Sequence, residues 1–328
     1  MLKPADLFKH HHVLAVGVPQ YDNHDELPYA AVDAEDVAAA FRSVGYRSGQ
    51  VVCVPPAETT YEDLRGYLNQ FHSAIREPGQ HGVLFWVGHG WSWDPDRPGV
   101  LIARDTGHAP RRNRDRRGQD AFTVGSLLSK LGKSEDFESA SPSGPETLTA
   151  FFDACHSRSG RESADFLGGV MHRESSQYVL GFEGKAYGDP SLGRKRHGTA
   201  AAGEGSGLVA HFLLTALDSD KCSSKGHPVV HADRLVEWVR HQIAERLYSQ
   251  GSQSTVWAYF PTEHRNPPPI GVDRAFLGSQ RIATMSTAAQ PFLTAMLQHI
   301  KPNFSPDEAQ GALDTELVGS AESRGDAT

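Results

Sequence analysis

The chain has 328 residues, enough to bury a full hydrophobic core without disulfides or metal ions. Acidic residues outnumber basic ones by 40 to 32, so the formal net charge is -8, the opposite balance to most nucleic-acid-binding proteins. The longest apolar run, about Val83 to Val87, is too short to cross a membrane, and the N-terminus does not resemble a signal peptide. The sequence contains only 3 cysteines, which argues against a disulfide framework and predicts a reducing compartment. We therefore expect a cytoplasmic protein with neither nucleic acid nor membrane as a partner.

Short apolar runs alternate with segments of helical periodicity along most of the chain. Strands are predicted at 13–18, 51–54, 83–87, 148–152, 178–182 and 255–260. Helices are predicted around 37–44, 64–75, 127–131, 166–171, 209–216 and 236–247. The second helix is preceded by a capping box, Thr59 to Glu62. Such alternation predicts an α/β sandwich with a mostly parallel central sheet and helices on both faces.

Domain organisation follows from where this pattern stops. Segments 109–119, 139–145 and 188–207 carry no apolar face and are expected to be exposed loops. After Pro267-Pro268-Pro269 the composition changes. We expect one domain over residues 1–269 and an accessory segment over 270–328, with one helix near 292–300 and a disordered tail from about 305.

Two of the predicted strands end in chemically reactive groups. Gly88-His89-Gly90 follows the strand at 83–87, and Asp153-Ala154-Cys155-His156 follows the strand at 148–152. Because sites in open parallel sheets form at the carboxyl ends of the strands, we expect the histidine and the cysteine to face each other. Each motif alone has a plainer interpretation: a cysteine after a strand is usually buried in the core, and Gly-His-Gly is usually a turn.

Paired in this way, the two side chains suit nucleophilic thiol catalysis. Cys155 would attack a carbonyl carbon, and His89 would carry the protons. The backbone N–H groups of Gly90 and Cys155 would hold the oxyanion. The run His10-His11-His12 lacks converging acidic or cysteine partners, so we interpret it as the polar start of the first strand and predict no metal site.

In combination, these motifs resemble the caspase-like cysteine peptidases, specifically the metacaspase and prokaryotic caspase-homologue branch. The resemblance extends from about Val13 to Phe260. It includes the opening strand, Val13 to Gly17, and the segment Leu27 to Val37, which is similar to the family's Asn-Asp-Ala helix start. It also includes Gly207 to His211, which is similar to the family's Gly-x-Phe-Thr segment. It implies a caspase-like α/β/α sandwich, an endopeptidase with a Cys-His dyad acting through an acyl-enzyme, protein or peptide substrates, and no cofactor.

The resemblance also implies roles for particular residues. His89 matches the catalytic histidine and Cys155 the nucleophile. Asp153 and Asp33 match the carboxylates that bind a basic P1 side chain in metacaspases, which implies cleavage after Arg or Lys. Taken alone, Asp33 also fits stabilisation of a helix N-terminus. Some metacaspases bind calcium, but two acids on a proline-rich loop, at 94 and 96, are weak support for calcium here.

The basic loops and the choice of reaction leave alternatives open. If the enzyme cleaves after arginine, its own loops are candidate processing sites, and the chain would be a zymogen activated by itself or by an upstream protease. These sites are Arg112, Arg117, Arg194 and Arg196. Plain solvated charge is the other interpretation of these loops. A non-catalytic caspase-fold interaction scaffold, or an acyl-transfer enzyme with the same dyad, remains an alternative function.

Overall fold

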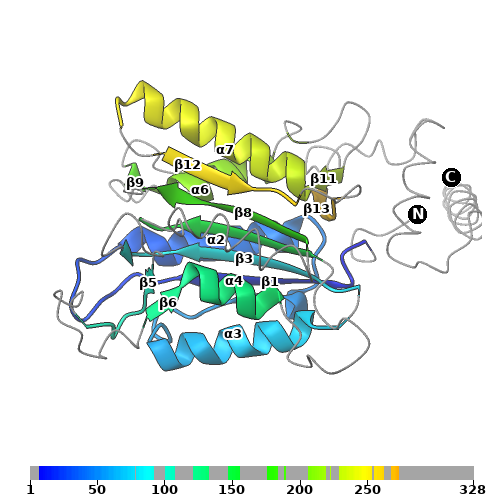
Figure 1. Ribbon diagram of the computed structural model, residues 1–328. Coiled ribbons are helices and arrows are strands. Elements are labelled where there is room, and N and C mark those ends of the chain that lie inside the picture. The colour runs from blue at the N-terminus through cyan, green and yellow to red at the C-terminus, as the bar shows by residue number, and fades with distance from the viewer. Residues whose placement is uncertain are drawn as a thin grey trace, which may run out of the picture.

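The computed structural model describes residues 7–77, 79–91, 100–107, 121–132, 147–155, 176–183, 188–189, 206–218, 222, 229–252, 255–261 and 267–272. Its centre is a six-stranded sheet in the order β12-β8-β7-β3-β1-β2 (Figure 1). The strands are β1 (His11–Gly17), β2 (Val51–Cys53), β3 (His81–Val87), β7 (Thr147–Asp153), β8 (Ser176–Glu183) and β12 (Thr255–Tyr259). All neighbours are parallel except β12, which runs antiparallel to β8.

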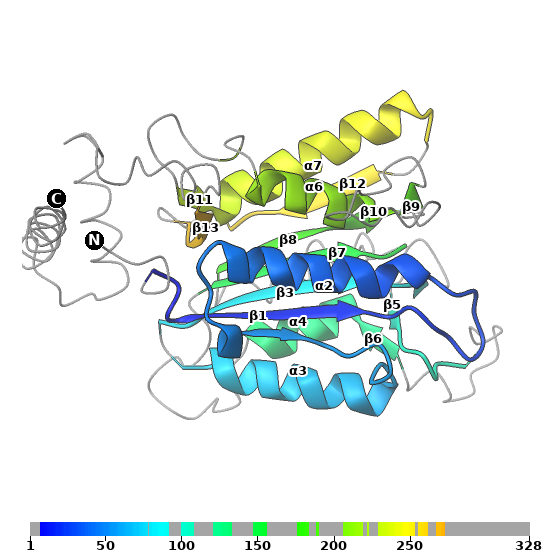
Figure 2. The same ribbon diagram turned by 180° about the vertical axis from the view of Figure 1, so that it is seen from behind.

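Helices cover both faces of the sheet, as the sequence predicts (Figure 2). One face is covered by α2 (Pro28–Ser43), α6 (Leu208–Leu217) and α7 (Ala232–Ser249), and the other by α3 (Tyr61–Ile75) and α4 (Val124–Gly132). Alternate residues of β1 enter the two cores: Val13 packs on the first face and Leu14 on the second. Burial on both faces explains why the central strands are continuous apolar runs. Among the described helices, none combines the length and apolar character needed to span a bilayer.

Several short elements are absent from the sequence prediction. A three-stranded antiparallel sheet of β4 (Gly90–Trp91), β5 (Val100–Ile102) and β6 (Ala121–Thr123) begins immediately after His89. The other additions are the 3-10 helix η1 (Ser48–Gln50) and the pairs β9 (Gly188–Asp189) with β10 (Ser206–Gly207) and β11 (Val229–His231) with β13 (Pro269–Val272). Segments this short show no periodicity, so only the folded chain defines them.

The last described strand crosses the domain boundary expected after residue 269. Ile270 and Val272 of β13 are buried in the core, and the carbonyl oxygen of Ile270 accepts a hydrogen bond from the Tyr46 hydroxyl at 2.8 Å. The folded domain therefore continues to Val272. The helices expected near 166–171 and 292–300, and the tail, lie outside the described residues.

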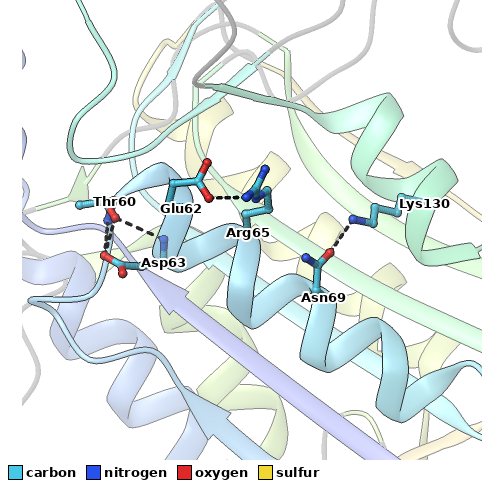
Figure 3. Close-up of polar contacts among 6 residues, drawn as sticks. All are labelled: Thr60, Glu62, Asp63, Arg65, Asn69 and Lys130. Carbon is cyan, nitrogen blue, oxygen red and sulfur yellow. Dashed lines mark hydrogen bonds and ion pairs between the residues drawn. The ribbon is translucent and has the colours of Figure 1, made fainter.

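The N-terminus of α3 differs by one residue from the predicted capping box (Figure 3). Thr60 is the N-cap: its hydroxyl accepts from the Asp63 N–H at 3.2 Å, and the Asp63 carboxylate accepts from the Thr60 N–H at 3.3 Å. Thr59 is fully buried and donates to the Pro56 carbonyl at 3.2 Å, so it belongs to the preceding turn. Glu62 instead forms an ion pair with Arg65. The expected box at Thr59 and Glu62 is therefore wrong by one position.

The histidine run at the start of β1 is less polar than expected. His11 is fully buried, and its ring stacks on that of His81 in β3 with a centroid separation of 4.4 Å. The two residues are register partners in the parallel β1–β3 ladder. Within the described part of the chain, no three histidine, cysteine or acidic side chains lie close enough to hold a metal ion.

Candidate active site

Strand register places His89 and Cys155 at the same edge of the sheet. Val87 and Asp153 are opposite each other in the β3–β7 ladder. His89 comes two residues after Val87, and Cys155 comes two residues after Asp153. The Gly88 N–H donates to the Asp153 carbonyl at 3.2 Å, which extends the pairing past the end of β3. The expectation that the two motifs converge is met at the level of the main chain.

Gly90 lies directly against the backbone of Cys155. A Cβ atom added to this glycine would lie 1.8 Å from the Cys155 carbonyl oxygen and 3.2 Å from its nitrogen. No side chain fits there, so the second glycine of Gly-His-Gly is required by close approach to the cysteine. The structure thus brings together the two residues expected to form the oxyanion hole; that role itself stays a prediction.

Three hydrogen bonds define the position of His89. Its Nε2 lies 2.8 Å from the carbonyl oxygen of Asp25, its backbone N–H donates to the Tyr21 hydroxyl at 2.7 Å, and its carbonyl accepts from the Ile102 N–H at 3.1 Å. A carbonyl oxygen only accepts hydrogen bonds, so this contact requires a hydrogen on Nε2. In the neutral imidazole, Nδ1 is then the basic nitrogen that can take a proton.

The carboxylates of Asp33 and Asp153 meet at the N-terminus of α6. Both side chains are buried. Asp33 accepts from the Ser206 hydroxyl at 2.8 Å and from the Gly207 N–H at 2.7 Å. Asp153 accepts from the Val209 N–H at 2.9 Å and from the Ala210 N–H at 3.3 Å. A Cβ on Gly207 would lie 2.1 Å from an Asp153 oxygen and 3.1 Å from an Asp33 oxygen, so the two groups are near neighbours.

These contacts give both carboxylates a stabilising role, which the sequence did not indicate for Asp153. Negative charge is favourable at the positive end of a helix, and here it also satisfies backbone donors that the helix itself leaves without partners. The alternative considered for Asp33 was stabilisation of a helix N-terminus. The structure shows that it acts on α6, which is remote in sequence, while lying inside its own helix α2.

Two tyrosines near the site are functional candidates that sequence reasoning missed. Burial raises the pKa of Tyr29 above its usual range, and the charges of Asp153, Asp33 and Cys155 raise it further. Burial likewise raises the pKa of Tyr21, with a smaller contribution from Cys155. Both phenols therefore keep their protons at neutral pH. The charges of the thiol and of both carboxylates thus all act on the Tyr29 phenol.

The remaining cysteines are poor nucleophiles by comparison. Burial, followed by the charge of Glu35, raises the pKa of the Cys53 thiol to about 11, so this thiol is protonated at neutral pH. Cys222 is buried, whereas Cys155 is partly exposed. Cys155 is thus the cysteine that combines access with a neighbouring histidine-bearing segment.

Several predicted residues lie outside the described residues: Asp94, Asp96, Arg112, Arg117, His156, Arg194 and Arg196. The calcium and processing predictions therefore stay predictions.

Comparison with known proteins identifies the family. Residues 10–255 match the family model described as the caspase domain. Among solved structures, the crystal structure of Caspase-1 from Spodoptera frugiperda is similar, at 12% sequence identity and a TM-score of 0.49, covering 80% of this chain and 90% of that one. A search of curated proteins found no match. Because this family model matches most of the chain, the protein belongs to the caspase-domain family of cysteine peptidases.

Proposed function

We propose that this protein is a cysteine endopeptidase that uses Cys155 as nucleophile and His89 as general base and acid. The observation that carries the proposal is the contact of the Gly90 backbone with the Cys155 backbone, which brings the histidine segment onto the cysteine at the carboxyl edge of the sheet. The family match supports the same chemistry.

The reaction divides into two steps on this geometry. In the first, Nδ1 of His89 takes the thiol proton, and the sulfur of Cys155 bonds to the scissile carbonyl carbon. The tetrahedral oxyanion would accept hydrogen bonds from the N–H groups of Gly90 and Cys155. When the amide bond breaks, His89 returns the proton to the leaving amine. Water, deprotonated by the same imidazole, then hydrolyses the thioester and regenerates the thiol.

The substrates we propose are proteins with Arg or Lys at the cleaved position, as in the metacaspase branch. The support is the location of two buried carboxylates, Asp33 and Asp153, near Tyr29 and the nucleophile. A cationic side chain would be attracted to this place and an acidic one repelled. Arginine would be favoured because its planar fork pairs with carboxylates in a bidentate manner.

Activation and location belong to the same proposal. We propose that the chain is a cytoplasmic zymogen, matured by cleavage at Arg112, Arg117, Arg194 or Arg196, either by itself or by an upstream protease. The support is that these arginines match the specificity proposed for the site.

The test is a panel of fluorogenic peptide amides that differ only at P1, with Arg, Lys, Asp or Leu. We expect cleavage after Arg and Lys, and loss of activity by several orders of magnitude in Cys155→Ala. Cys53→Ala is the matched control, because it removes a thiol from the same domain without touching the site. A preference for Asp would refute the specificity. Full activity of Cys155→Ala would refute the assignment of the nucleophile.

A further inference from the structure

Tyr21 contacts both the main chain and the ring of His89. It lies in the loop between β1 and α2 and is 8% exposed. Its hydroxyl oxygen accepts the His89 backbone N–H at 2.7 Å, and its ring centroid lies 4.6 Å from that of the imidazole, with the planes inclined by 49°. One side chain, 68 residues away in sequence, therefore fixes the histidine from two directions.

Gly88 provides the space that this hydroxyl needs. A Cβ at position 88 would lie 2.8 Å from the Tyr21 Oη, so a side chain there would displace the hydroxyl. The two glycines around His89 are thus required by different contacts: Gly88 leaves space for the Tyr21 hydroxyl, and Gly90 leaves space for the Cys155 backbone.

The loop that carries Tyr21 is itself anchored. The Asp22 N–H donates to the Arg104 carbonyl at 2.9 Å, and the Asn23 side chain donates to the Thr106 carbonyl at 3.2 Å. The segment that accepts these bonds directly follows Ile102, whose N–H donates to the His89 carbonyl. Tyr21 and His89 are therefore attached to the same short segment, so their relative position is defined by more than their own contact.

From this geometry we infer that Tyr21 is a positioning residue for the catalytic histidine, holding its main chain so that Nδ1 reaches the thiol. The inference rests on the proposed function. Proton transfer requires the base within hydrogen-bond reach of the group it deprotonates, so small displacements of the histidine reduce the rate. Because burial raises its pKa, the Tyr21 phenol stays neutral and adds no charge beside the imidazole. Its contribution is therefore one of position.

A matched control separates positioning from general stabilisation. Tyr46 is also a buried tyrosine with one hydrogen-bonded hydroxyl, 2.8 Å from the Ile270 carbonyl. Its ring stacks on Phe8, before the start of β1, so it lies at the opposite edge of the sheet from His89. Tyr46→Phe and Tyr21→Phe each remove one buried hydroxyl and keep the ring.

The experiment compares these two variants with wild type and His89→Ala. For each protein it measures kcat and KM on the best peptide amide of the panel, the rate at which iodoacetamide labels Cys155, and the urea midpoint. We expect both Phe variants to lose similar stability. Only Tyr21→Phe should lower kcat, by about three- to tenfold for one hydrogen bond. Its KM should match that of wild type, because substrate binding does not use the histidine. Its labelling rate should fall no further than kcat, because alkylation needs only the removal of the thiol proton, whereas turnover also needs protonation of the leaving amine.

Each outcome separates this inference from the proposed function. If Tyr21→Phe retains the wild-type kcat, or loses no more than Tyr46→Phe, Tyr21 is a structural residue only and the inference is wrong. If Tyr21→Phe also raises KM and slows the labelling of Cys155 more than it slows turnover, the site has been disordered and positioning is again refuted. If wild type and His89→Ala do not differ on any peptide, the dyad itself is wrong and the inference falls with it.

Discussion

Replacement of Asp33 by alanine tests the role of the carboxylate pair at the start of α6. The side chain is 1% exposed and accepts two hydrogen bonds, from the Ser206 hydroxyl at 2.8 Å and the Gly207 N–H at 2.7 Å. Hydrogen bonds to a charged group contribute about 1.5–3 kcal/mol each, so Asp33→Ala should lower the free energy of unfolding by about 3–6 kcal/mol. That is a large part of the stability of an ordinary domain, about 5–15 kcal/mol.

Two further variants divide this loss into its parts. Asp33→Asn keeps an acceptor for the Gly207 N–H, and its amide can donate to the Ser206 oxygen, so it should cost only about 1 kcal/mol. Ser206→Ala removes one donor to the charged carboxylate and should cost about 1.5–3 kcal/mol. The free energies come from urea unfolding curves analysed with a common slope. A loss below about 1 kcal/mol in Asp33→Ala would refute the reasoning, since the two bonds would then contribute no more than exposed ones.

The same variants report on substrate preference. Asp33→Asn removes the charge and preserves the fold, so a role in binding a cationic P1 side chain predicts a lower kcat/KM for the Arg peptide with little change for Leu. An equal decrease for both peptides would assign Asp33 to stability alone.

Two other substitutions have defined outcomes. Gly90→Ala should lower kcat about a hundredfold in the peptide assay, because its Cβ would overlap the Cys155 carbonyl and displace the cysteine or histidine segment; wild-type turnover would contradict the contact. Burial, followed by the charge of His81, lowers the His11 pKa well below 6.5. The folded state then binds fewer protons than the unfolded state, so stability decreases as the pH falls below about 6.5. His11→Phe should weaken this decrease, measured as urea midpoints at pH 7 and 5, and parallel pH profiles would refute it.

The parts of the fold that depend on local pattern were predicted from the sequence. Central strands buried on both faces are continuous apolar runs. All six strands of the central sheet were expected, each within a few residues of its observed bounds. The juxtaposition of the two motifs followed from a topological rule, that the carboxyl ends of parallel strands share an edge. The observed strand register, with Val87 opposite Asp153, agrees with this juxtaposition.

The parts that depend on distant contacts were not predicted. Tyr21 contacts His89, which is 68 residues away in the sequence, and the residues around Tyr21 in the sequence do not indicate this hydrogen bond. His11 is buried and its ring stacks on that of His81 in another strand, a contact that the histidine run alone does not indicate. The capping box failed by one position, because two consecutive threonines have the same propensity and only burial distinguishes Thr59 from Thr60.

The carboxylate pair also bears on how processing after Arg196 would act. A cut at Arg196 would separate the helix that carries Val209 from the preceding chain. In the fold, Asp33 binds Ser206 and Gly207, and Asp153 binds the first turn of α6, all on the C-terminal side of that cut. Hydrogen bonds from residues 33 and 153 do not depend on the chain being continuous at 196. We therefore expect the start of α6 to keep its hydrogen bonds to Asp33 and Asp153 after a cut at Arg196. We expect any effect of this cut on activity to come from the residues on either side of it.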